Sequence, residues 1–296
     1  MPEFRGSAAG RPTCGMCAAL LLLLAGGCHP SDLLRSSDDP VARPWSEDAA
    51  ALRFEYGFEG LSSLADLPSV AWMRIGTTMP ENAVQLSHDV VYAGQTALRL
   101  DAIPSGQTEP VSKAYVQVAD EPGRPVRLFA GDRVRLSAWF LVVGERSLQG
   151  LTLFDLESES CWRDEFGRNP SPGIRLMLSG GNDYLVVERG KIGLGHATLR
   201  QTATRFPRNR WVHVEWEVDL SPGADGAVSI LLDGEPILAA AGATLPDAAT
   251  MGAALGRPDF RINEPVYYDR IQVGITANAT VDPATVYVDD VRLESW

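Results

Sequence analysis

The sequence predicts an all-β domain folded as a two-sheet antiparallel β-sandwich. From residue 54 onward, apolar and polar side chains alternate with a period of two, and clusters of Gly and Pro separate the alternating runs. Such alternation is typical of strands that bury one face, and many short strands with regular turns favour a sandwich. Because 45% of the residues are hydrophobic, the chain has enough apolar material for one large core.

Two runs are long enough to assign their inward faces. The run 133–143 would bury Val134, Leu136, Ala138, Phe140 and Val142. The run 211–219 would bury Val212, Val214, Trp216 and Val218. The runs 226–232 and 270–275 alternate in the same way, and only one short helix is expected, near 247–255.

The first 27 residues have the parts of a secretory signal peptide. Two arginines precede an uncharged, leucine-rich run, and the small residues Ala25-Gly26-Gly27 lead into Cys28. This junction resembles the lipobox of bacterial lipoproteins, which implies that the signal 1–27 is removed and that Cys28 carries a lipid. The alternative is an ordinary membrane anchor, although the apolar run is shorter than the roughly 20 residues of a spanning helix.

The remaining chain divides into a tether and a folded domain. Residues 28–50 hold the lipidated Cys and a Ser-, Asp- and Pro-rich stretch without an apolar period, which is typical of a flexible linker. Residues 51–296 form the predicted sandwich. A lipid at Cys28 would hold the domain in the bacterial cell envelope, and His29 rather than Asp at the next position favours the outer membrane by analogy with the lipoprotein sorting rule.

Charge and cysteine content exclude several classes of function. The chain carries 26 Lys and Arg against 38 Asp and Glu, a net charge of −12. Nucleic acid is therefore an unsuitable partner, because phosphate binding needs clustered basic residues. Beyond Cys28 the only cysteine is Cys161, so the sequence predicts no internal disulfide in the domain.

Six segments of the domain match a known fold in their order. They are 89–100, 131–139, 172–178, 209–216, 225–234 and 286–293. Together they resemble the concanavalin A-like jelly roll, in the branch that includes the heparin-lyase-like polysaccharide lyases, over nearly all of 54–296. The resemblance implies a convex sheet packed on a concave sheet, whose groove binds a glycan chain.

The resemblance leaves the choice between binding and catalysis open. A lyase that cleaves a uronate-containing glycan by β-elimination needs a group that neutralises the carboxylate, a base for the C5 proton and an acid for the leaving oxygen. Of three catalytic strands in the related lyases, only the Tyr-rich one survives, at 267–270, and the Arg-x-Glu and Gln-x-His patterns are absent. We therefore expect a groove that binds polysaccharide. The alternative is a lyase in which Tyr268 is the acid or base, assisted by Arg270 and Lys113.

Further side chains are candidates for the groove. The expected glycan-binding residues are Tyr115, Trp139, Trp162 and Arg163. Their aromatic rings would stack on sugar faces, and the guanidinium would pair with an acidic glycan. Two alternatives stay open: Trp162 anchors a solvated loop, or the domain is a scaffold that binds protein.

A glycosidase reaction has weaker support. The run Leu153-Phe-Asp155-Leu-Glu157 resembles the Glu-x-Asp-x-Glu strand of the jelly-roll glucanases, with Leu153 in place of the nucleophile. Because a glycosidase needs two carboxylates flanking the scissile bond, we expect Asp155 and Glu157 to be solvent-side strand residues. His213, next to Trp211 and Glu215 in the alternation, is expected to be structural.

A structural cation is expected where the first and last strands meet. Pairing of these strands would place Glu59 beside Asp289 and Asp290. Carboxylate and carbonyl oxygens suit Ca²⁺, and the resemblance to glycan-acting jelly rolls implies calcium at this seam. The alternative is that the three carboxylates only cap exposed strand ends.

Overall fold

The computed structural model describes residues 52–106, 111–118, 126–159, 171–179, 183–192, 204–254, 256–257, 260–262 and 265–296. These residues all belong to one compact unit. The signal peptide, Cys28, the tether, Trp162 and Arg163 lie outside the described residues, so the predictions made for them stay predictions. In the described part, no helix is long and apolar enough to cross a membrane.

Strands dominate the described chain. In order they are β1 (Leu52–Tyr56), β2 (Met73–Thr77), β3 (Ala83–Ser87), β4 (Ala97–Ala102), β5 (Ala114–Val118), β6 (Leu128–Phe129), β7 (Arg133–Val142), β8 (Leu151–Glu157), β9 (Gly173–Ser179), β10 (Tyr184–Glu188), β11 (Trp211–Asp219), β12 (Ala227–Leu232), β13 (Glu235–Ala241), β14 (Tyr267–Tyr268), β15 (Arg270–Asn278) and β16 (Ala284–Ser295). The helical elements are η3 (Leu64–Asp66), α1 (Leu67–Val70), η4 (Gly190–Ile192) and α2 (Ala248–Ala254). The helix α2 is the one that the sequence predicts near 247–255.

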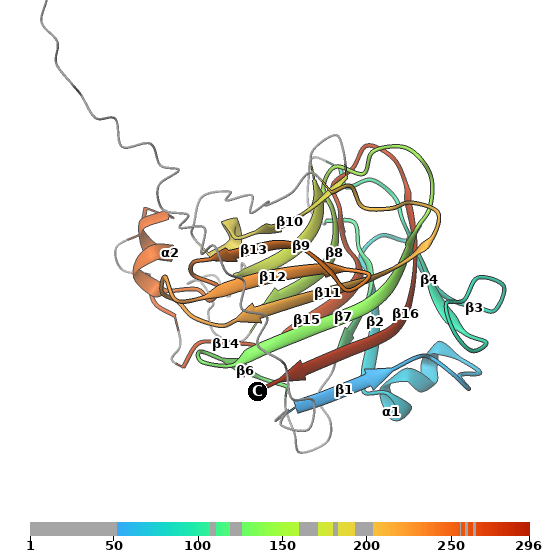
Figure 1. Cartoon of the computed structure of the whole chain (residues 1–296), viewed down its shortest axis with the longest axis horizontal. Helices are drawn as coiled ribbons and strands as arrows, with labels where there is room; N and C mark the ends of the chain where they lie inside the picture. Colours follow the sequence, from blue (N-terminus) through green and yellow to red (C-terminus); the bar gives the residue numbers. More distant parts are fainter. Residues whose placement is uncertain are drawn as a thin grey trace, which may run out of the picture. The chain divides into compact units, whose positions relative to one another are not determined.

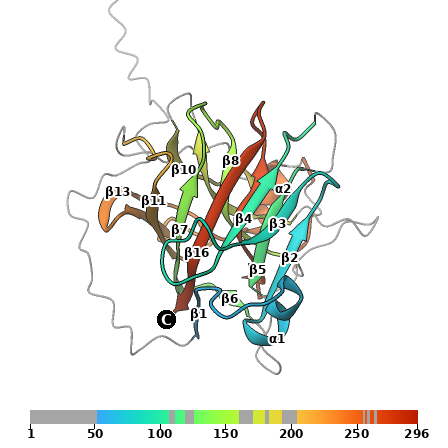
Figure 2. The same ribbon diagram turned by 90° about the vertical axis from the view of Figure 1, so that its right-hand side faces the viewer.

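The strands form two main antiparallel sheets (Figures 1 and 2). An eight-stranded sheet has the order β13-β12-β11-β7-β16-β4-β3, with β1 paired to β16 beside this path. A six-stranded sheet has the order β10-β9-β8-β15-β5-β2, and β14 and β6 form a separate pair. This arrangement confirms the predicted two-sheet antiparallel β-sandwich.

One large hydrophobic core fills the space between the sheets. Phe140 on β7 and Trp216 on β11 both meet Phe154 on β8 of the facing sheet, with ring centroids 5.2 Å and 6.3 Å from that of Phe154. Every inward residue predicted for the runs 133–143 and 211–219 is buried. The period of two therefore predicted correctly which residues of these two strands face the core.

The strand β15 departs from the predicted alternation. It continues to Asn278, and every residue after Arg270 is buried. Its inward residues belong to the core, but Gln272 and Thr276 on its outer side are polar and also 0% exposed. Other side chains must cover these polar groups, so the outer face of the six-stranded sheet is not a simple solvent-facing surface.

Candidate functional site

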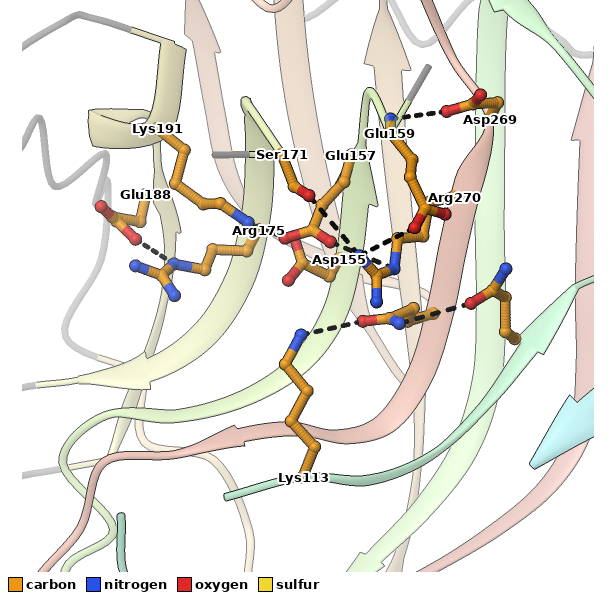
Figure 3. Close-up of polar contacts among 12 residues, drawn as sticks. Lys113, Asp155, Glu157, Glu159, Ser171, Arg175, Glu188, Lys191, Asp269 and Arg270 are labelled. Carbon is orange, nitrogen blue, oxygen red and sulfur yellow. Dashed lines mark hydrogen bonds and ion pairs between the residues drawn. The ribbon is translucent and has the colours of Figure 1, made fainter. Parts of the chain in front are cut away.

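The outer face of the six-stranded sheet carries a dense group of charged side chains. They come from β8, β9, β10, η4, β15 and the residue before β5, and Figure 3 shows them pointing toward one another. We name this set the charged face: Lys113, Asp155, Glu157, Arg175, Glu188, Lys191 and Arg270.

Strand register brings these side chains together. In the pairing of β8 with β15, Arg270 lies opposite Glu157, and Gln272 lies opposite Asp155. In the pairing of β8 with β9, Arg175 lies opposite Asp155. Directly opposed residues of antiparallel strands have Cβ atoms about 4.5–5.5 Å apart. The period of two in each strand thus places opposite charges side by side across the sheet.

Cations from η4 and β15 cover the two carboxylates of β8. The Lys191 ammonium forms an ion pair with Glu157 and lies 3.6 Å from Oδ1 of Asp155. The Nε atom of Arg270 lies 3.5 Å from Oε2 of Glu157. Burial lowers the pKa of Lys191, while the charge of Asp155 opposes this shift. Asp155 and Glu157 are only 1% and 3% exposed, so the expectation that they face solvent is wrong.

Several buried polar atoms of this face make no hydrogen bond to the described chain. They include Oδ1 of Asp155, Oε2 of Glu157 and Nε of Arg270, together with the hydroxyls of Thr152 and Thr276. Most buried polar atoms in proteins are satisfied, because leaving one without a partner costs about 1–3 kcal/mol. The charged atoms among them lie in ion pairs with one another, and together these buried polar groups make the outer face of the six-stranded sheet a candidate functional site.

Lys113 differs from the other cations of the charged face. Its Nζ donates a hydrogen bond to Oε1 of Gln272 at 3.2 Å and lies 5.8 Å from the ring centroid of Tyr115. Burial lowers the pKa of Lys113, and the charge of Asp155 partly offsets this effect. Its hydrogen-bond partner is a neutral amide, and among the described residues no carboxylate lies within ion-pair distance of the ammonium.

Tyr115 lies beside Lys113 because the edge strand leaves room for its ring. Gly76 on β2 is directly opposite Tyr115 on β5. A Cβ atom at Gly76 would overlap the Tyr115 ring. The missing side chain at Gly76 thus allows the aromatic ring to lie over β2 on the outer face.

Three of the predicted groove residues lie on one face, and a fourth does not reach it. Lys113, Tyr115 and Arg270 share the outer side of the six-stranded sheet. Tyr268 is fully buried, and its hydroxyl donates to the carbonyl oxygen of Thr244 at 2.5 Å. This corrects the prediction of Tyr268 as an acid or base, because a buried phenol whose proton is already donated to the backbone cannot reach a bound glycan.

Trp139 is also misplaced by the sequence prediction, because it lies on the other sheet. Its ring on β7 stacks on Tyr92 with centroids 3.6 Å apart and lies 5.0 Å from the ring of His213. It therefore cannot share a binding surface with Tyr115. His213 lies 3.5 Å from Glu215, and this hydrogen bond lowers the pKa of Glu215, in keeping with a structural role.

Leu153 does not occupy the place of a missing catalytic carboxylate. The register of β8 shifts between Thr152 and Phe154, and Leu153 is part of the hydrophobic core. Asp155 and Glu157 on the same strand are held by buried ion pairs. The likeness to the glucanase strand therefore does not extend to the geometry of the site.

The first and last strands meet as predicted, and their carboxylates bind a neighbouring loop. Glu59 accepts hydrogen bonds from the backbone NH groups of Gln95 and Thr96. Asp289 accepts hydrogen bonds from the backbone NH groups of Tyr92 and Ala93. These bonds attach the loop between β3 and β4 to the seam of β1 and β16.

The predicted calcium ligands are close in space but already engaged. Burial raises the pKa of Asp290, and the nearby carboxylates of Glu55 and Glu59 raise it further. Within the described residues, however, no three His, Cys, Asp or Glu side chains converge as ligands for one metal ion. In this arrangement the carboxylates supply negative charge but do not form a coordination site. Calcium binding at the seam stays a prediction.

Sequence reasoning missed four residues of this site: Arg175, Glu188, Lys191 and Gln272. Arg175 and Gln272 occupy outward positions of alternating strands, so the period of two could have placed them on this face. Lys191 belongs to a short 3-10 turn after β10, and no periodicity links it to β8. Only the folded chain reveals that its ammonium reaches Glu157.

Comparison with solved structures finds the same architecture in proteins of very different sequence. The chain is similar to a cellulose-induced protein, Cip1, with a TM-score of 0.50 and 15% identity, over 81% of this chain and 96% of that one. An endo-β-1,4-glucuronan lyase from the fungus Trichoderma reesei gives a TM-score of 0.51 and 12% identity, over 83% and 95% of the two chains. The alginate lyase Aly36B gives 0.50 and 12%, over 81% and 96%.

The fold is an antiparallel jelly roll. At these identities the likeness shows the fold alone, and the residues of the charged face must carry any argument about activity. No family model and no curated protein sequence matches the chain.

Proposed function

We propose that the charged face binds an acidic polysaccharide, with a uronate carboxylate at Lys113. The observation that carries this proposal is the half-buried Lys113 ammonium, whose hydrogen-bond partner is the neutral amide of Gln272. A carboxylate on the ligand would supply the missing counter-charge. Hydrogen bonds between ionised partners are roughly twice as strong as neutral ones.

The remaining cations of this face are less suitable for the same role. Arg175 pairs with Glu188, while Lys191 and Arg270 both pair with Glu157. A ligand carboxylate at any of these three would compete with an internal carboxylate that is already in place. Among the described residues, Lys113 meets no such competitor, so it is the preferred anchor.

Tyr115 supplies the second requirement of a glycan site. An aromatic ring with a polar hydroxyl can stack on the apolar face of a sugar and hydrogen-bond to its hydroxyl groups. The ring lies within 5.8 Å of the Lys113 ammonium, so one sugar residue could contact both. Because a glucuronan lyase and an alginate lyase share this fold, oligomers of glucuronan and alginate are the first ligands to test.

Calorimetric titration with these oligomers tests the proposal. We expect the Lys113→Gln variant to bind at least about 10-fold more weakly than the wild type, since a hydrogen bond to a charged group contributes about 1.5–3 kcal/mol. Arg99→Gln is the matched control, because Arg99 pairs with Asp101 on the other sheet. Equal affinities of the wild type and Lys113→Gln would exclude Lys113 as the anchor.

A polysaccharide lyase is the second candidate, favoured by the lowered pKa of Lys113 beside a tyrosine. A neutral amine can take the C5 proton, and the Tyr115 hydroxyl can protonate the leaving oxygen. Activity would then rise with pH as Lys113 loses its proton. Absorbance of the unsaturated product should grow for the wild type and vanish for Tyr115→Phe, while oligomer binding persists. If the oligomers bind but the absorbance does not grow, lyase activity is excluded for these substrates and the binding function stands.

We also propose that the protein is anchored in the bacterial cell envelope by a lipid. Its support is the Ala-Gly-Gly sequence before Cys28. Intact-mass measurement should find an acylated chain beginning at Cys28, and Cys28→Ser should leave an uncleaved or soluble protein. The same acylated product from the variant would contradict the lipoprotein assignment.

A structural Ca²⁺ at the seam of β1 and β16 also remains a proposal. Its support is the environment of Asp290, whose pKa is raised by burial and further by the nearby carboxylates of Glu55 and Glu59. A divalent cation would offset the repulsion of these carboxylates, and carboxylate oxygens are the ligands that Ca²⁺ prefers.

A further inference from the structure

Arg189 is a buried cation that the proposed glycan site does not use. It follows β10 directly, at the margin of the six-stranded sheet, and is only 8% exposed. Its Nη1 donates one hydrogen bond to the carbonyl oxygen of Ala243 at 3.2 Å. Its Nε is buried and has no hydrogen-bond partner among the residues that the structure describes.

No carboxylate of the described chain compensates the charge of Arg189. Burial alone lowers its pKa, without an opposing contribution from a nearby acid. Arg208 shows the usual arrangement at similar burial: its guanidinium bonds to Asp183 and to the carbonyl oxygens of residues 142, 143 and 146. Within the described chain, the guanidinium of Arg189 therefore has one carbonyl oxygen as its partner, whereas that of Arg208 has a carboxylate and three carbonyl oxygens.

An anion would stabilise an uncompensated guanidinium in such a place. Arginine cannot lose its proton in a protein, so it cannot avoid the cost of burial by becoming neutral. Burying an ionised group without a partner costs several kcal/mol, which a bound counter-ion would offset.

The backbone beside Arg189 is shaped to admit the guanidinium. Gly242, just after β13, has a φ of +139°, and a Cβ at this position would overlap the guanidinium. A residue with a side chain would therefore both strain the backbone and displace Arg189. The turn after β13 thus keeps the cation in place without supplying a negative charge.

We propose that Arg189 is the centre of an oxyanion-binding site between the end of β10 and the turn after β13. Its ligand is a carboxylate, sulfate or phosphate group, whose paired oxygens match the fork of guanidinium NH groups. The group is either a free anion or an acidic substituent of the glycan. In both cases free phosphate and sulfate bind to the site.

Thermal melting with increasing phosphate or sulfate, at ionic strength fixed with chloride, tests the site. A ligand that binds only the folded state should raise the wild-type melting temperature by about 5 °C or more when its concentration is about 100-fold above Kd. Sulfate also stabilises proteins non-specifically, so Arg189→Gln and the control Arg99→Gln are melted in parallel. The saturable rise should be lost in Arg189→Gln and kept in Arg99→Gln. An equal rise in all three proteins would overturn the proposal.

Two further measurements keep the test decisive. If Arg189→Gln does not fold, calorimetric titration of the wild type with inorganic phosphate decides: one saturable site supports the proposal, and no saturable binding overturns it. Lys113→Gln should still bind phosphate, which separates this site from the proposed glycan anchor. If the anion belongs to the glycan, phosphate will compete with acidic oligomers; if it is a free ion, oligomer affinity will be unchanged by phosphate.

Discussion

The two outer faces of the sandwich use the same cross-strand pairing of charges, but the pairs are buried to different extents. On the eight-stranded sheet, Arg133 lies opposite Asp219 and Arg135 opposite Glu217. Side chains of the first pair are 31% and 37% exposed, and those of the second pair are 13% and 18% exposed. Glu294 on β16, opposite Arg135, is buried. On the six-stranded sheet, Asp155 and Glu157 are almost completely buried under their cations.

This difference teaches that charge alone does not mark the site. Exposed cross-strand pairs contribute little and serve mainly to keep the sheet soluble and in register. Buried pairs carry a desolvation cost that the sandwich does not need for its own stability. On the charged face, Oδ1 of Asp155 and Oε2 of Glu157 are buried and lie in ion pairs with Lys191 and Arg270, but they accept no hydrogen bond from the described residues.

The largest expected effect is on stability, when one carboxylate is removed from each face. Glu157→Ala leaves Lys191 and Arg270 without their shared partner, so we expect a loss of about 3–5 kcal/mol in the free energy of unfolding. Asp219→Ala removes an exposed partner of Arg133 and should cost about 0–1 kcal/mol. Urea denaturation measures both, and equal losses would remove the distinction between these buried and exposed pairs.

A smaller effect is expected from Asp289, which attaches the loop of Tyr92 to the eight-stranded sheet. Burial raises the pKa of Asp289 from 3.8 to about 6. Between these values the folded state binds the proton more tightly than the unfolded state. The contribution of Asp289 to the free energy of unfolding therefore falls as pH rises from about 4 to 6. The free energy of unfolding, measured across that pH range, should fall more in the wild type than in Asp289→Asn. A difference between the two proteins that is independent of pH would contradict the shift.

The smallest effect is expected from calcium at the seam. Because a cation would offset the repulsion around Asp290, melting in calcium should occur a few degrees above melting in excess chelator. Asp290→Ala should melt at the same temperature in both. Identical wild-type curves would withdraw the calcium proposal and leave the seam held by backbone hydrogen bonds alone.

The fold could be predicted because its signal is local. The alternation in β7 and β11 reports directly which side chains point inward, and each strand repeats the signal independently. The outer position of Tyr115 on β5 follows from the same rule. These are properties of consecutive residues, and they need no knowledge of how distant strands pair.

The site was harder to predict because it depends on pairing between distant segments. Tyr268 and Arg270 are two residues apart, yet the phenol is enclosed by the turn at Thr244 while the guanidinium reaches Glu157. Periodicity gave no means of separating them, because Tyr268 ends β14, which pairs with β6, whereas Arg270 begins β15 in the six-stranded sheet. Trp139 was misassigned for a similar reason, since the alternation gives its direction but not the sheet to which its strand belongs.

The most direct test of the central claim pairs a change in the protein with a change in the ligand. Affinity is measured for an acidic oligomer and for the same oligomer with its carboxylates reduced to alcohols, using the wild type and Lys113→Gln. If Lys113 binds the uronate carboxylate, reduction weakens wild-type binding by about 10-fold or more but hardly changes binding to Lys113→Gln. If both proteins lose affinity equally on reduction, the carboxylate is bound elsewhere and the charged face does not act through Lys113.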